Sequence, residues 1–156
     1  MLNVESREEN GAQLIILSGT INEDTNLLES CPVDRKQVIF DCGKVQRINS
    51  VGVKNWIQFM KHLSQEGISV TLRECSVSLV EQINMIKDFI PSSAKIESVQ
   101  LPYYSSDLDQ DFTKTFTLDA LKASFPNPPA AMDENGKEAE FDDIPEEYLA
   151  FIKARS

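Results

Sequence analysis

The feature that most constrains the fold is a short apolar, β-branched segment followed closely by an amphipathic helical pattern. Residues 37–42, QVIFDC, predict a buried strand, and residues 51–65 predict a helix with its apolar side chains on one stripe. Gly67 is placed to end that helix. A strand joined to a helix by a short turn is the unit from which α/β folds are built, so this class is expected.

Weaker patterns extend the same alternation on both sides. Strands are expected at 2–7, 12–18, 68–73 and 95–101, and shorter helices at 26–30 and from Ser76 to about Asp88. Residues 1–101 therefore predict an α/β domain with the order β-β-α-β-α-β-α-β.

A change in charge and proline content suggests a boundary near Pro102. Residues 1–101 carry 13 acidic and 10 basic residues (net −3), whereas residues 102–156 carry 12 acidic and 5 basic residues (net −7). The second part, 102–156, predicts a small α+β extension with a strand at 112–118, a loop at 126–140 and a final amphipathic helix that starts at Ile144.

The overall charge of −10 argues against nucleic acid and anionic membrane as partners, because both require clustered basic residues. No apolar run is long enough to span a bilayer, so no membrane insertion is expected, and no secretory pattern is visible at the start. The three cysteines are widely spaced without a C-x-x-C pair. We therefore expect a cytoplasmic protein without a disulfide framework, a metal site or a cofactor.

Groups suited to catalysis are scarce, so no catalytic residue is assigned and an enzyme is not expected. The single histidine, His62, falls on the polar side of the 51–65 helix. No phosphate-binding glycine loop and no nucleophile elbow occur. The acidic run at 107–111 lacks the glycine and the later glutamate of a calcium loop. A small nucleotide-binding enzyme that uses one edge of the sheet is kept as the alternative from another class.

Three segments resemble a STAS domain, the family of bacterial anti-sigma factor antagonists. They are LIILSGTINEDTN, VIFDCGKVQRINSVG and GISVTLRECSVSLVEQINMIKDFI, and together they fall within residues 1–101. The resemblance implies a mixed β-sheet flanked by helices. It also implies a non-enzymatic regulatory module that binds an anti-sigma factor or a related serine kinase.

In that family the serine of an Asp-Ser-x-Gly motif is phosphorylated by the partner kinase, and Ser50 occupies its position here. Two carboxylates of the family pattern are amides in this chain, at Asn22 and Asn49. Two interpretations of Ser50 stay open: a regulated phosphorylation site, or the N-cap of the helix that follows. A related alternative is a scaffold subunit of a transporter or signalling assembly that is never phosphorylated.

The resemblance also implies a docking face at one end of the sheet. The residues expected to form it are Asn22, Asn49, Ser50, Val51, Gly52, Lys54 and Asn55. The first strand and the final helix leave room for a homodimer.

The C-terminal extension resembles a zinc ribbon that lacks its metal ligands. PYYSSDL and FPNPP stand where two metal-binding turns would be expected, and neither contains Cys or His. Such an extension must instead bury its aromatic residues against the core or a second chain, and these are Tyr103, Tyr104, Phe112, Phe116, Phe141, Tyr148 and Phe151.

Overall fold

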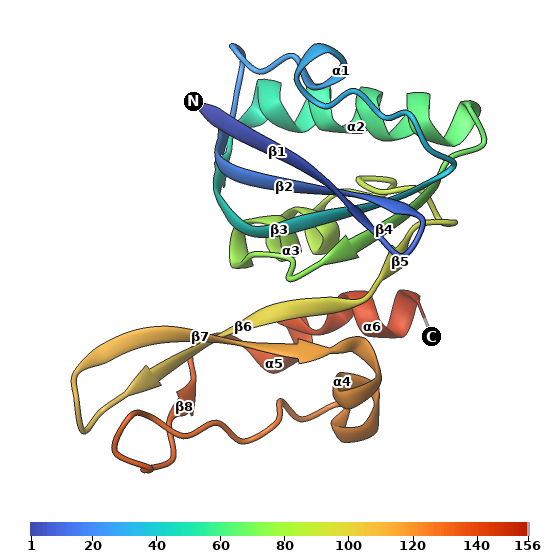
Figure 1. Ribbon diagram of the computed structural model, residues 1–156. Helices are drawn as coiled ribbons and strands as arrows, with labels where there is room; N and C mark the ends of the chain where they lie inside the picture. The colour runs from blue at the N-terminus through green and yellow to red at the C-terminus, as the bar shows by residue number, and fades with distance from the viewer. Residues whose placement is uncertain (156) are drawn as a thin grey trace.

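Two β-sheets organise the chain in the computed structural model, which describes residues 1–155 (Figure 1). The first sheet has five strands in the order β1-β2-β3-β4-β5. Only the β1–β2 pair is antiparallel, and the other neighbours are parallel. Its strands are β1 (Leu2–Glu9), β2 (Ala12–Ile21), β3 (Gln37–Ile48), β4 (Ser69–Arg73) and β5 (Lys95–Ile96).

Helices cover both faces of this sheet (Figure 1). The long helix α2 (Ser50–Gln65) lies on one face together with the short α1 (Leu27–Ser30), and α3 (Val77–Met85) lies on the other. Ser76 caps α3, as the sequence predicts, because its side chain accepts the Leu79 N–H. The cap of α1 is Asn26, whose side chain accepts the Glu29 N–H, and not one of residues 22–25, from which the cap was expected. The predicted α/β class is confirmed.

The central strand β3 is longer than its apolar segment. It continues past Asp41 to Ile48, directly before α2, and its register against β2 shifts twice. The strand predicted at 37–42 is therefore too short by six residues. Val45 is buried and Ile48 half-buried, so the inward side chains of this segment are three residues apart instead of two, in the region where the register shifts.

A second sheet of three strands follows, in the order β7-β6-β8. Its strands are β6 (Ser98–Ser105), β7 (Gln110–Thr117) and β8 (Glu140–Phe141), and the remaining helices are α4 (Leu118–Ser124), α5 (Pro145–Tyr148) and α6 (Ala150–Ala154). The expected final helix is thus divided into two short ones at Leu149.

The expected strand 95–101 is also divided. Lys95 and Ile96 pair with β4, whereas the chain from Ser98 onward pairs with β7 in the second sheet. Pro102, where the composition suggested a boundary, lies inside β6. The two sheets are consequently joined by the single residue Glu97.

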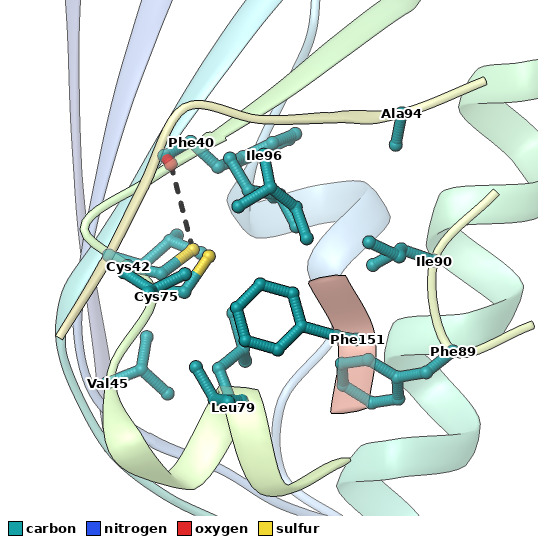
Figure 2. Packing of buried hydrophobic residues seen from close by; sticks show 14 of the residues in the cluster. Phe40, Cys42, Val45, Cys75, Leu79, Phe89, Ile90, Ala94, Ile96 and Phe151 are labelled. Carbon is teal, nitrogen blue, oxygen red and sulfur yellow. Dashed lines mark hydrogen bonds between the residues drawn. The ribbon is translucent and has the colours of Figure 1, made fainter. Parts of the chain in front are cut away.

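One hydrophobic cluster extends across both sheets. Phe151 of α6 points into the same core as Leu79 of α3 and Phe89 of the following loop (Figure 2). Of the seven aromatic residues expected to be buried in the extension, Tyr103, Tyr148 and Phe151 are 3% exposed or less. The other four, Tyr104, Phe112, Phe116 and Phe141, are half-buried. Among residues 1–155, no helix combines the length and the apolar character needed to cross a membrane.

Candidate functional site

The first turn of α2 is capped by Asn49. Its Oδ1 accepts the Gly52 N–H at 2.8 Å, and its carbonyl accepts the Val53 N–H at 2.8 Å. Asn49 has the extended backbone typical of an N-cap, with φ −92° and ψ 179°. The interpretation of Ser50 as the cap is therefore wrong, because the preceding residue already performs that function.

Ser50 is the first residue of α2 and is exposed. Its hydroxyl forms no hydrogen bond within residues 1–155. Lys54 is four residues further along, so the two side chains occupy the same face of the helix, and Lys54 is exposed as well. The serine hydroxyl is thus free for chemistry at a helix N-terminus, where negative charge is favoured.

Gly52 brings α2 into direct contact with the end of β2. A Cβ atom built on Gly52 would lie 2.1 Å from the carbonyl oxygen of Ile21 and 2.6 Å from its carbon. Gly52 is buried, so it cannot contact a partner directly, and its place among the expected docking residues is corrected. Its role is to allow the helix to approach the strand.

The loop after β2 is folded around Asn22 and Thr25. The Asn22 N–H donates to the Thr25 hydroxyl at 3.0 Å, and the Asn22 side-chain oxygen accepts the Asp24 N–H at 3.0 Å. The amide of Asn55, on the second turn of α2, donates to the carbonyls of Asn22 (3.4 Å) and Thr25 (3.2 Å). The convergence of this loop with the start of α2 is therefore real, and Asn55 fixes it.

Glu23 is a member of this region that the sequence analysis missed. Its carboxylate accepts the Asn49 side-chain N–H at 2.7 Å. That hydrogen bond, together with one to the backbone N–H of Glu23 itself, holds the pKa of Glu23 below its ordinary value. A carboxylate thus lies against Asn49, even though Asn22 and Asn49 lack the carboxylates of the family pattern.

These contacts define a surface that we call the α2 docking surface. It consists of Asn22, Glu23, Asn49, Ser50, Val51, Lys54 and Asn55. Val51 is 46% exposed, and Leu28 of the adjoining α1 is 54% exposed. Two hollows of about 420 and 330 Å³ flank the surface, one beside Asn49 and Arg47 and the other beside Glu23 and Asn55. The surface therefore offers apolar, polar and charged groups together.

The other residues whose side chains are suited to chemistry are the single histidine and the three cysteines. His62 is exposed on α2, and the three cysteines are buried and free. Burial raises the pKa of Cys31 and of Cys75 to about 12, so both thiols are protonated at neutral pH. Residues 1–155 contain no cluster of three or more His, Cys, Asp or Glu side chains arranged to hold a metal.

In the extension, two turns are joined by polar side chains. The Ser105 hydroxyl donates to Asp133 at 2.8 Å, and Asp107 accepts from Lys137 at 2.8 Å and from Asn135 at 3.2 Å. These contacts join PYYSSDL to the turn at 133–137, and the Tyr103 hydroxyl also donates to the carbonyl of Pro129 in FPNPP at 2.6 Å. The carboxylate of Asp107 is thus engaged by Lys137 and Asn135.

Comparison with known proteins adds no identity. No protein-family model matches the chain, and no curated protein matches it.

Proposed function

We propose that this chain is a non-enzymatic regulatory module that binds a partner protein through the α2 docking surface, and that phosphorylation of Ser50 weakens this binding. The resemblance to anti-sigma factor antagonists suggests an anti-sigma factor or a related serine kinase as the partner. The observation that carries the proposal is the free, exposed hydroxyl of Ser50 beside an asparagine that already caps the helix.

A phosphate on Ser50 is compatible with the local electrostatics. The N-terminus of α2 carries a partial positive charge, and Lys54 lies one turn away on the same face. The added group brings between one and two negative charges and new acceptor oxygens to the docking surface. A partner that contacts a neutral serine next to Val51 would then meet a charged, strongly hydrated group, which costs binding free energy.

The experiment uses the protein as bait for native partners, with the wild type and three variants compared by quantitative mass spectrometry. Ser50→Asp adds charge at the site, Ser50→Ala removes the hydroxyl, and Ser64→Asp adds the same charge at the other, exposed end of α2. We expect an anti-sigma factor or serine kinase to bind the wild type, Ser50→Ala and Ser64→Asp. Its recovery on Ser50→Asp should fall at least tenfold, which corresponds to about 1.4 kcal/mol.

Phosphorylation itself is tested by incubating the protein with the recovered kinase and ATP, followed by peptide mapping. Modification of Ser50 in the wild type, and none in Ser50→Ala, is the expected result. Equal recovery of the partner on all four baits, with no phosphate at residue 50, would overturn the switch.

A constitutive scaffold is the second candidate, and Glu23 favours it. Its carboxylate lies 2.7 Å from the Asn49 amide, so a phosphate on Ser50 would be placed near existing negative charge. The exposed side chains of Val51 and Leu28 can contribute to docking without any modification. In this case Val51→Lys should reduce capture of the partner, whereas Ser50→Asp should leave it unchanged.

A further inference from the structure

A cleft of about 810 Å³ lies where the first sheet meets the C-terminal helices. Its walls come from the end of α3, the loop 87–94, the edge strand β5, Leu118 of α4 and the C-terminal part of α6. The volume lies within the range of roughly 300–1,000 Å³ that is typical of small-molecule sites. None of the residues of the α2 docking surface lines it.

The interior of the cleft is apolar. Ile90 and Phe151 are 5% and 3% exposed and continue directly into the hydrophobic core (Figure 2). Ile83, Ile86 and Leu118 are half-buried and complete the apolar lining. An apolar body of a ligand would therefore replace water chiefly against the three half-buried side chains, Ile83, Ile86 and Leu118, which is favourable.

Positive charge gathers at the same cleft. Lys87, Lys95 and Arg155 line it, against one acidic residue, Asp88. None of the three cations forms an ion pair within the described part of the chain. The chain as a whole has a net charge of −10, whereas these three unpaired cations make the charge around the cleft positive.

Arg155 is the most constrained of the three. Its guanidinium donates to the carbonyls of Ala94 (2.7 Å) and Pro91 (3.1 Å). A guanidinium has five N–H donors, so donors remain for another acceptor. Burial lowers the pKa of Arg155, which reflects the cost of holding its charge away from water without a carboxylate partner.

We propose that this cleft binds an anionic amphiphile, whose carboxylate or phosphate head contacts Arg155, Lys87 and Lys95 while its acyl or aryl body packs against Ile83, Ile86 and Phe151. A peptide is less suited to the site. β5, the edge strand beside the cleft, is only two residues long, which is too short to hold a peptide by main-chain hydrogen bonds.

The only tryptophan of the chain provides the readout. Trp56 is fully buried and stacks on Phe89, a lining residue of the cleft, with ring centroids 5.7 Å apart. We would titrate the protein with decanoate, decyl phosphate and decanol below their micellar concentrations and follow tryptophan fluorescence and calorimetric heat. We expect saturable binding of at least one anionic probe, and at least tenfold weaker binding of decanol.

Variants locate the head group. Lys87→Gln/Lys95→Gln should weaken binding of the anionic probe at least fivefold, whereas Lys44→Gln/Lys114→Gln, with the same net charge but outside the cleft, should leave it unchanged. Arg155→Gln should weaken it further. If that variant fails to fold, the lysine pair still decides the matter.

Three results would overturn the proposal. One is equal affinity for decanol and the anionic probes. Another is equal loss of affinity in the two lysine pairs. The third is the absence of saturable binding by both decanoate and decyl phosphate. None of these outcomes depends on Ser50, so the proposal stands or falls separately from the regulatory function.

Discussion

Gly52 faces the carbonyl of Ile21 so closely that no side chain fits between them: a Cβ on Gly52 would lie 2.1 Å from the Ile21 oxygen. The contact joins α2 to the end of β2 and places Ser50 beside the loop that contains Asn22. Glycine has no side chain, and the Ile21 carbonyl belongs to the backbone. Neither group can therefore move aside without a shift of the main chain.

Gly52→Ala should therefore destabilise the protein strongly. We expect a loss of about 3 kcal/mol in the free energy of unfolding, at the upper end for an overpacked core, because backbone rather than a flexible side chain must move. Urea denaturation followed by circular dichroism gives the measurement. Gly67→Ala is the matched control: Gly67 has φ 72° and no atom near its missing Cβ, so only the left-handed backbone is penalised, by about 1–2 kcal/mol. Equal losses in the two variants would contradict this account.

Asn49 and Ser50 should respond differently to alanine. Asn49→Ala removes the acceptor for the Gly52 N–H and should cost about 1 kcal/mol of unfolding free energy. Ser50→Ala should change stability by less than about 0.5 kcal/mol, because its hydroxyl is exposed and forms no hydrogen bond in the described chain. The reverse order in thermal and chemical denaturation would mean that Ser50 is the cap in solution.

The ion pairs of Arg73 should make stability depend on pH. Arg73 contacts Glu9 and Glu97, each at 2.6 Å, and its hydrogen bond to Glu9 holds the pKa of that carboxylate below 4.5. As the pH falls, Glu9 is protonated at a higher pH in the unfolded chain than in the folded one. The stabilisation from this ion pair is therefore present above about pH 4.5 and is lost as the pH falls through the folded-state pKa of Glu9. The difference in unfolding free energy between the wild type and Glu9→Gln should shrink as the pH falls from about 4.5 through the folded-state pKa of Glu9.

The control for this prediction is the Arg73→Gln background. There Glu9→Gln should have no such pH-dependent effect, since the partner that lowers the pKa is gone. A difference that persists unchanged in the absence of Arg73 would show that another group is responsible.

Tyr148 should contribute through its hydroxyl as well as its ring. The ring is 2% exposed, and the hydroxyl donates to the Gln100 carbonyl at 2.6 Å. Tyr148→Phe should cost about 1 kcal/mol, because the partly buried carbonyl of Gln100 loses this donor without any change in the packing of the ring. Tyr104→Phe, at an exposed hydrogen bond to Asp109, should change stability much less. Comparable thermal shifts in both variants would refute the assignment.

Much of the first sheet and its helices could be predicted from the hydrophobic pattern and the capping residues. Local sequence patterns predict where a helix begins and ends. They therefore predicted the 51–65 helix, its end at Gly67 and the cap at Ser76. The change from the first sheet to the second after Ile96 could not be predicted in this way. Residues 95–101 alternate continuously, and a period of two is the same in either sheet, so nothing local indicates that the pairing partner changes at Glu97.

The site shows the same division. The Asn22 loop and the start of α2 were expected to converge because they lie at one end of the sheet. Asn and Ser are equally good N-cap residues, so sequence could not decide between Asn49 and Ser50. Glu23 was missed because its partner is 26 positions away, and such a hydrogen bond leaves no local pattern.

The strand β6 has a consequence for how the protein comes apart. It leaves the first sheet after a single connecting residue, Tyr148 binds its backbone, and Phe151 completes the core under α3. The hydrophobic cluster is therefore shared between the two parts of the chain. Heating should produce one calorimetric transition for the whole chain, and truncation at Pro102 should destabilise residues 1–101, because it removes Phe151 from the core.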